Sequence, residues 1–287
     1  VLGIVAWFVA DAIGKRELRK ALAKAEAAGL PTTFEEIIPP PPRREGNFFA
    51  TPALDGFDRP EWDEVKEECV DLGRAKRERI EQLVEPQDAF LEWIRTRPPA
   101  GGLSYRNFEP LREGLELSAE GTATEQVLAW YEREHGELLR ELAKASKLPH
   151  AELQTQFSLE QSAPEMLGAQ LPHLQTMQKL ARGCTYHALA AIREGDGQVA
   201  LADIRVVSRI IDGCLNDGPI LSVMVAITAD AIVNVAIREG LGKRVWSAEQ
   251  LIELQLLVGE IDWVRELDQS FGFEAVLMTE ILSLIHI

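Results

Sequence analysis

The sequence contains little cysteine and comparatively little positive charge. Its three cysteines, Cys69, Cys184 and Cys214, are too few and too scattered for a disulfide framework, and their spacing does not indicate a structural metal. The chain has 30 Lys and Arg against 46 Asp and Glu, which gives a net charge of −16. Such a chain repels nucleic-acid phosphates and anionic lipid head groups. We therefore expect no nucleic-acid partner, no metal and no cofactor.

The chain also lacks the motifs of the common enzyme classes. It has no GxSxG, P-loop, HExxH or dinucleotide fingerprint, and the Gly-rich EGDG at 194–197 lacks the strand context of a phosphate loop. Asp230 and Asn234 are the best candidates for chemistry, since they lie one turn apart on the most apolar predicted helix. A buried Asp must be paired, hydrogen-bonded or protonated. We predict a structural pairing with an Arg or a helix end, a functional pocket, or exposure of that helix face, and we assign no catalytic residue.

The histidines do not form a recognisable ligand set. In WYEREHGELL, only Tyr131 and His135 share a helix face, because neighbours one or two positions apart diverge. His173 and His187 are 14 residues apart on one predicted helix, a rise of about 21 Å, so they cannot bind one ion within it. We predict that each is an ordinary surface or core histidine.

Both ends of the sequence are apolar. Val1–Ile13 is apolar except for Asp11. It is shorter than the span of about 20 residues that a bilayer needs, so we interpret residues 1–28 as a truncated transmembrane anchor and stalk helix. A buried core helix and a signal-peptide h-region are the alternatives. The basic residues that follow favour a cytoplasmic location for the next segment. The other end stops at EILSLIHI, within an apolar helical pattern, and we interpret its last residues, Leu284–Ile287, as foreign sequence at the end of a fragment.

Residues 29–60 are predicted to be a proline-rich linker. Pro39–Pro42 excludes helix and central strand, because proline fixes φ and lacks an N–H. The segment is either a solvated spacer, a strap that Phe48, Phe49 and Phe57 hold against the domain, or a ligand of a proline-binding module.

The rest of the chain is predicted to be all-α, an irregular helical bundle or helical-hairpin array. Residues 61–160 form an N-terminal helical region with a helix over Trp62–Glu85 and another that begins at the capping box Thr122–Glu125. Residues 161–287 form a C-terminal domain, in which a helix from Pro172, the turn at 194–197 and a returning helix make a hairpin.

Three further helices are predicted in that domain. Pro219–Ile237 is apolar around its whole circumference, as in a helix enclosed by neighbours. A second membrane span is the rival interpretation, which Asp230 and Asn234 disfavour, since a carboxylate at mid-membrane costs about 2.5–3.5 kcal/mol. A fourth helix is expected from Ser247 through Leu267, and a fifth from Phe271 to Leu282.

The order of four segments resembles that in a family of uncharacterised bacterial proteins: AAGLPTTFEEIIPPPP, LPHLQTMQKLARG, AIREGDGQVALADIRVVSRI and WSAEQLIELQLLVGEID. The resemblance is loose over the N-terminal third and close over 171–267. It implies a single-pass protein with an N-terminal membrane anchor and an extracytoplasmic helical domain. The hairpin ALAAIREGDGQVALADIRVVSRI also resembles a tetratricopeptide (TPR) unit, although no 34-residue period extends through the chain.

These observations predict a membrane-anchored, extracytoplasmic α-helical protein of the cell envelope that acts as a protein-interaction or scaffold module. Its partners would be the membrane, through the N-terminal helix, and other envelope proteins. The alternative is a hydrolase-like envelope enzyme with a site near Asp230 and Asn234.

Overall fold

The computed structural model describes residues 31–38, 42–54, 108–153, 172–259 and 261–285, the strands at 61–63 and 68–70, residues 78–80 and 82, and parts of 16–29. The predicted anchor at Val1–Ile13 and the prolines Pro39–Pro41 lie outside the described residues. The described architecture is all-α, as predicted, apart from one short pair of strands.

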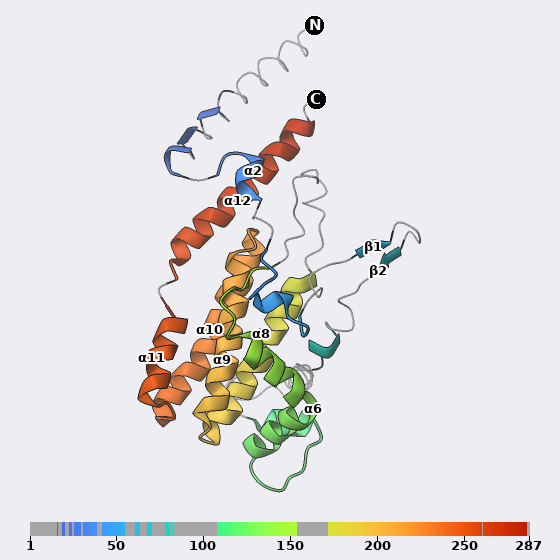
Figure 1. Cartoon of the computed structure of the whole chain (residues 1–287), viewed down its shortest axis with the longest axis vertical. Helices are drawn as coiled ribbons and strands as arrows, with labels where there is room; N and C mark the ends of the chain where they lie inside the picture. Colours follow the sequence, from blue (N-terminus) through green and yellow to red (C-terminus); the bar gives the residue numbers. More distant parts are fainter. Residues whose placement is uncertain are drawn as a thin grey trace.

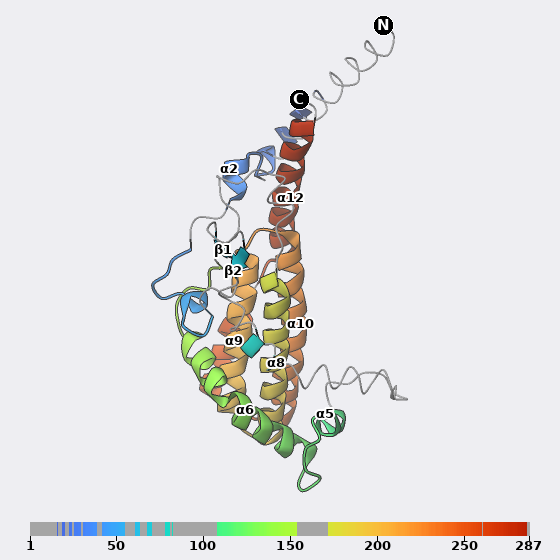
Figure 2. The ribbon, with the colours of Figure 1, turned by 90° about the vertical axis from the view of Figure 1, so that its right-hand side faces the viewer.

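Three long helices form the centre of the molecule: α8 (Pro172–Arg193), α9 (Gly197–Leu215) and α10 (Ile220–Lys243) (Figure 1). They lie side by side in both ribbon views (Figure 2). Small residues at their contacts, such as Ala188, Ala200 and Ala229, are almost completely buried and let the helix backbones approach closely. These helices share one hydrophobic core with α6 (Ala123–Ala145).

The predicted hairpin of α8 and α9 is confirmed. Gly195 takes a positive φ of 84°, a conformation that glycine adopts without steric cost. The Asp196 side chain then accepts the N–H groups of Gln198 and Val199, both at 3.0 Å, and caps the start of α9. The turn therefore stops one helix and starts the next within a few residues.

Helix α10 is enclosed on only one side. It buries Ala226, Ala229 and Val233 against its neighbours, whereas Leu221 and Met224 are 52% and 55% exposed. By length and composition α10 could also cross a membrane, and 44% of its apolar window is buried. A buried core helix of a soluble protein has the same length and composition.

Helix α6 begins where its capping box predicts. The Thr122 hydroxyl accepts the Glu125 N–H at 3.1 Å, and the Glu125 carboxylate accepts the Thr122 N–H at 2.8 Å. The helix packs against α8 and α9 (Figure 2) and is preceded by the short α5 (Glu109–Gly114).

The fourth predicted helix is wrong in length. Helix α11 (Ala248–Leu257) starts at the predicted Ser247 cap but stops near Gly259, and one helix, α12 (Trp263–Ile285), covers both the end of the predicted fourth helix and the fifth. The Asp262 carboxylate accepts the Arg265 N–H at 3.1 Å, which opens α12. Asp262 lies within the apolar pattern from which one helix through Leu267 was predicted, so the pattern did not reveal the break.

Residues 42–54, which we call the strap, pack into the core. Phe48 and Phe49 in the 3-10 helix η1 (Phe48–Ala50) are buried. The Asn47 side chain donates to the Arg43 carbonyl at 2.8 Å and the Glu152 carbonyl at 2.7 Å, and it accepts the Glu152 N–H at 3.0 Å. Of the three alternatives for the proline-rich segment, the strap held against the domain therefore agrees with the positions of Phe48 and Phe49. Phe57 lies outside the described residues.

Two small elements lie outside the bundle. Helix α2 (Phe34–Ile37) starts at a capping box formed by Thr33 and Glu36, and it lies beside α12. Strands β1 (Glu61–Asp63) and β2 (Glu68–Val70) pair antiparallel, with Trp62 opposite Cys69, so the helix predicted from Trp62 is wrong at its start. Strands of three residues are too short to show the alternation that identifies a strand in a sequence.

The strap makes a testable contribution to stability at Gly213 on α9. A methyl group there would overlap the Phe49 ring, so Gly213→Ala should lower the free energy of unfolding by about 2 kcal/mol in urea denaturation. Gly242→Ala on α10 is the matched control, because its added methyl group meets nothing within 4 Å. This control should instead stabilise by about 0.5–1 kcal/mol. Equal effects of the two changes would contradict the docked strap.

Candidate functional site

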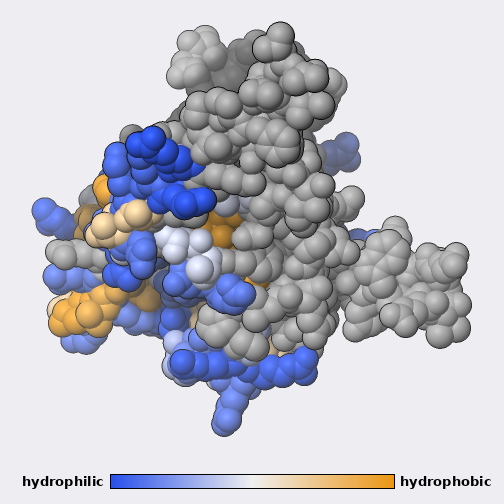
Figure 3. Space-filling view, turned by 90° about the horizontal axis from the view of Figure 1, so that it is seen from above, coloured by the Kyte–Doolittle hydropathy of each residue, from blue (hydrophilic) through white to orange (hydrophobic). Residues whose placement is uncertain are grey.

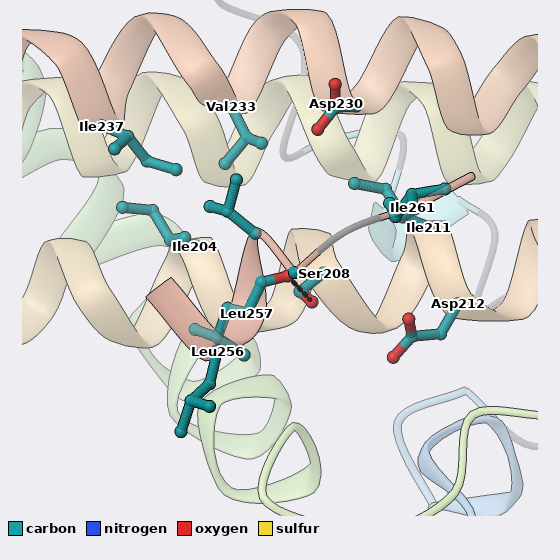
Figure 4. A pocket seen from close by; sticks show the side chains of 12 residues that line it. Ile204, Ser208, Ile211, Asp212, Asp230, Val233, Ile237, Leu256, Leu257 and Ile261 are labelled. Carbon is teal, nitrogen blue, oxygen red and sulfur yellow. Dashed lines mark hydrogen bonds between the residues drawn. The ribbon is translucent and has the colours of Figure 1, made fainter. Parts of the chain in front are cut away.

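The two predicted site residues, Asp230 and Asn234, lie one turn apart on α10 and differ in their surroundings. The Asn234 side chain donates to the backbone carbonyl of Asp230 at 2.8 Å, so its amide is engaged within α10. Asp230, in contrast, lines a pocket between α9, α10 and the connection from α11 to α12 (Figure 4). Among the described residues, no ion pair to the Asp230 carboxylate is formed. The predicted pairing with an arginine is therefore not observed in the part of the chain that the structure describes.

The pocket is small and mostly apolar. Its volume is about 220 Å³, below the range of about 300–1,000 Å³ typical of sites for drug-sized ligands. Its size suits a single side chain or a small molecule. The apolar lining includes Ile204, Ile211, Val233, Ile237, Leu257 and Ile261.

Three polar side chains also line the pocket. Ser208 on α9 donates to the Leu257 carbonyl at 3.4 Å, and Asp212 is paired with Arg209 at 3.1 Å. Burial raises the pKa of Asp230, an effect that the Asn234 amide partly opposes. Burial also raises the pKa of Asp212, and Arg209 opposes it. Asp230 is therefore the carboxylate of this pocket that an incoming cation would stabilise most directly.

A second polar cluster, which the sequence analysis did not identify, lies inside the bundle. His187 on α8 and Asp203 on α9 are almost completely buried, with the His187 Nδ1 and an Asp203 oxygen 2.8 Å apart. Glu132 on α6 lies on the other side of the ring, 3.6 Å from His187 Nε2, too far for a hydrogen bond. One imidazole therefore lies between carboxylates from two other helices.

The charges in this cluster are strongly coupled. Burial opposes ionisation of His187, but Asp203, with a smaller contribution from Glu132, outweighs it and raises the pKa of His187 to about 9. Burial raises the pKa of Asp203, and His187 offsets part of that effect. Contact with His187 lowers the pKa of Glu132. At neutral pH the imidazole is accordingly charged and links α6, α8 and α9.

Aromatic side chains surround the cluster. The Tyr131 ring centroid lies 5.4 Å from that of His187 and 6.2 Å from that of His135, so Tyr131 and His135 share a face as predicted. His187 was predicted to be an ordinary surface or core histidine; it lies in the core, and the prediction missed its acidic partner. His187 and Asp203 each lie eight residues from Gly195, on opposite arms of the hairpin. Matching polar residues at equal distances from the turn is the signal that would have found this pair.

A third cluster joins the ends of the three central helices. Asp217, between α9 and α10, accepts a hydrogen bond from the Ser222 hydroxyl and lies 3.3 Å from His173 Nε2 on α8. All three side chains are buried. A carboxylate held between a serine and a histidine does not activate the serine, because the histidine is not placed to remove its proton. We interpret this cluster as structural.

Two of the three cysteines, one on α8 and one on α9, lie in the core. Cys184 and Cys214 are free and buried, as predicted, and the Cys214 Sγ contacts the Met177 Sδ at 3.3 Å. Burial raises the pKa of both thiols well above the ordinary value. Neither is therefore an activated nucleophile. Among the described residues, no group of three or more His, Cys, Asp and Glu side chains could hold a metal ion.

The buried His187 pair predicts a specific pH dependence. The pKa of His187 is raised from 6.5 to about 9 in the folded state, so its stabilisation is fully present below pH 6.5 and is lost as the pH rises through 9. Wild-type protein should lose about 2–3 kcal/mol of unfolding free energy between these limits relative to His187→Gln, which does not titrate. Urea denaturation at a series of pH values measures the difference. Parallel curves for the two proteins would show that His187 is neutral in the fold.

Comparison with known proteins does not assign the chain to a family. No protein-family model, no curated protein and no solved structure matches it. The functional conclusion therefore depends on the pocket, the surface and the charges of the chain itself.

Proposed function

We propose that this chain is a protein-interaction module of the cell envelope, anchored in the membrane by its N-terminal helix. Its binding surface consists of large apolar side chains on α10, α11 and α12. The exposure of these side chains is the observation that supports the proposal most strongly.

All the exposed large apolar side chains of the described residues lie between 221 and 278, on these three helices and the connection after α11. Leu256 is the most exposed at 76%, and Val264 is 70% exposed. We call this set the apolar surface; its members are Leu221, Met224, Ile227, Leu241, Leu251, Ile252, Leu256, Val258, Val264, Phe271 and Met278. Figure 3 shows apolar side chains gathered on the left, the side on which α11 lies in Figure 1.

The pattern of exposure on α12 favours a helical partner. Val264, Phe271 and Met278 follow one another at intervals of seven residues, so they form one stripe along the helix. A stripe of large exposed apolar side chains favours an interaction site, because its contact with water is unfavourable. An amphipathic helix laid along the stripe would cover it.

The resemblance of the α8–α9 hairpin to a tetratricopeptide unit agrees with this role. In such units small residues face the partner helix, and Ala181, Ala188 and Ala191 of α8 are fully buried. Tetratricopeptide arrays present helix faces to peptide partners. The proposal extends only to the hairpin, since one repeat is not an array.

The envelope location is supported by the apolar segment Val1–Ile13 and by the resemblance to anchored bacterial proteins. The strap adds a physical argument, since its buried Phe48 and Phe49 connect the N-terminal part of the chain directly to the bundle. We propose that this connection holds the bundle close to the membrane, on the extracytoplasmic side.

A hydrolase-like enzyme receives less support. The described pocket beside Asp230 contains Ser208, but its hydroxyl donates to the Leu257 carbonyl and no histidine lines the pocket among the residues described. A serine without a neighbouring base is a weak nucleophile. We therefore retain the interaction module as the proposed function.

Site-specific photo-crosslinking in cells tests the apolar surface. Leu256→p-benzoylphenylalanine and Phe271→p-benzoylphenylalanine should each give a discrete protein adduct. Arg140→p-benzoylphenylalanine is the control, since the Arg140 side chain is 72% exposed on α6 and is not part of the apolar surface. Adding Ile252→Lys, which places a charge on the surface, should remove the Phe271 adduct without lowering the thermal midpoint. Adducts to lipid alone, or none at Leu256 and Phe271, would contradict the proposal.

Cell fractionation tests the location separately. The full-length protein should sediment with membranes, resist extraction by high salt and dissolve in detergent. Protease added outside spheroplasts should digest the helical domain, because the proposal places it beyond the cytoplasm. Recovery of the full-length protein in the soluble cytoplasmic fraction would contradict the anchored location and leave the apolar surface to the crosslinking test.

A further inference from the structure

The geometry of the Asp230 pocket points to a specific function within this surface, and the inference rests on the proposed interaction role. We infer that the pocket binds a basic side chain, arginine or lysine, that a partner helix inserts: the alkyl stem lies between α9 and α10, and the cationic end meets the Asp230 carboxylate.

The shape and lining of the pocket suit such a side chain. Ile204 and Ile211 on α9 face Val233 and Ile237 on α10 across a space of about 220 Å³ (Figure 4). Apolar walls would contact the methylene stem of an arginine or lysine, whose charged end prefers a polar position at the rim. Asp230 is half-buried and lines this pocket, so it offers that position.

The chain does not supply the cation itself in the part that the structure describes. Three part-buried arginines of the bundle pair with other groups: Arg193 Nε with Glu239 at 2.7 Å, Arg205 Nε with Glu253 at 2.7 Å, and Arg209 Nη1 with Asp212 at 3.1 Å. Asp230 has no such pairing among the described residues. A partly desolvated carboxylate without a cation gains more from an incoming basic group than an exposed one does.

The surface around the pocket indicates which other side chains the partner helix carries. Leu256 and Val258 line the pocket and are also 76% and 40% exposed, so they form an apolar shelf beside its entrance. Residues 248–285 contain eight carboxylates and a single arginine, Arg265, and the whole chain carries a net charge of −16. A partner with apolar and basic side chains would satisfy both features and be attracted from a distance.

These charges favour a basic amphipathic helix over a second copy of the chain. Two copies, each with a net charge of −16, would bring carboxylates together around the entrance. The predicted occupant is therefore a helix that carries an Arg or Lys among apolar residues spaced to reach Leu256 and Val258.

Methyl NMR with small cations tests the pocket independently of any partner. The full chain is labelled at the isoleucine Cδ1 methyl groups and titrated with n-butylguanidinium, n-butylammonium and the uncharged 1-butanol. The methyl signals of Ile204, Ile211, Ile237 and Ile261 should shift with saturation for the two cations, and those of Ile192, fully buried elsewhere on α8, should not. Butanol should bind at least about tenfold more weakly, since it lacks the charge.

Two variants separate the pocket charge from general electrostatics. Asp230→Asn should raise the Kd for butylguanidinium about tenfold, whereas Asp268→Asn, which removes the same charge from an exposed site on α12, should change it less than twofold. Ser208→Leu should block the pocket and abolish the shifts. The thermal midpoint of Asp230→Asn should be equal to or above that of wild type, which excludes unfolding as the cause of weaker binding.

Other results would overturn the inference. Equal binding of butanol and the cations, or an Asp230→Asn variant that binds as wild type does, would make the pocket a purely apolar site. Absence of any shift at the four isoleucines would remove the pocket as a site altogether. If crosslinks at Leu256 and Phe271 persist in either case, the proposed interaction surface stands without this pocket; if they are missing and the shifts occur, the surface proposal fails instead.

Discussion

Close contact among α8, α9 and α10 is the constraint on which the rest of the structure depends. Small residues at these contacts, including Ala188, Ala200 and Ala229, are almost completely buried, so the helix backbones approach closely and bury a continuous core. Because α10 directs its small residues toward α8 and α9, large ones such as Leu221 and Met224 remain on the opposite side. The part of the apolar surface that lies on α10 is therefore a consequence of how the core is packed.

Apolar packing alone would allow the helices to slide, and the buried polar groups oppose this. A shift of one helical turn, about 5.4 Å, would separate His187 from Asp203 and leave charged groups unpaired in the interior. The contacts of Asp217 with Ser222 and His173 fix the helix ends in the same way. We interpret these pairs as determinants of register, while burial of the apolar residues supplies most of the stability.

The sequence predicted the features that depend on local chemistry. The capping boxes at Thr122 and Ser247 and the turn at Gly195 lie where their residue types predicted, because each depends on a few neighbouring side chains. The break between α11 and α12 was missed, since the Asp262 cap lies inside an uninterrupted apolar pattern. The His187–Asp203 pair and the docking of Phe49 against Gly213 depend on packing between distant segments, which periodicity does not reveal.

Asp230 was predicted as a candidate on polarity alone, and its surroundings give that choice a physical meaning. The other buried or half-buried carboxylates described on α9 and α10 have a basic partner: Asp203 has His187, Asp212 has Arg209 and Glu239 has Arg193. Burial raises the pKa of Asp230, and the Asn234 amide opposes this effect only in part, so the charge of Asp230 opposes folding rather than supporting it. A half-buried carboxylate that costs stability and has no basic partner among the described residues is more readily explained by binding than by folding. Exposed leucines contribute to affinity but do not select the orientation of a partner. A single carboxylate in an apolar pocket determines which side chain enters and how it is oriented. The carboxylate therefore makes the interface specific.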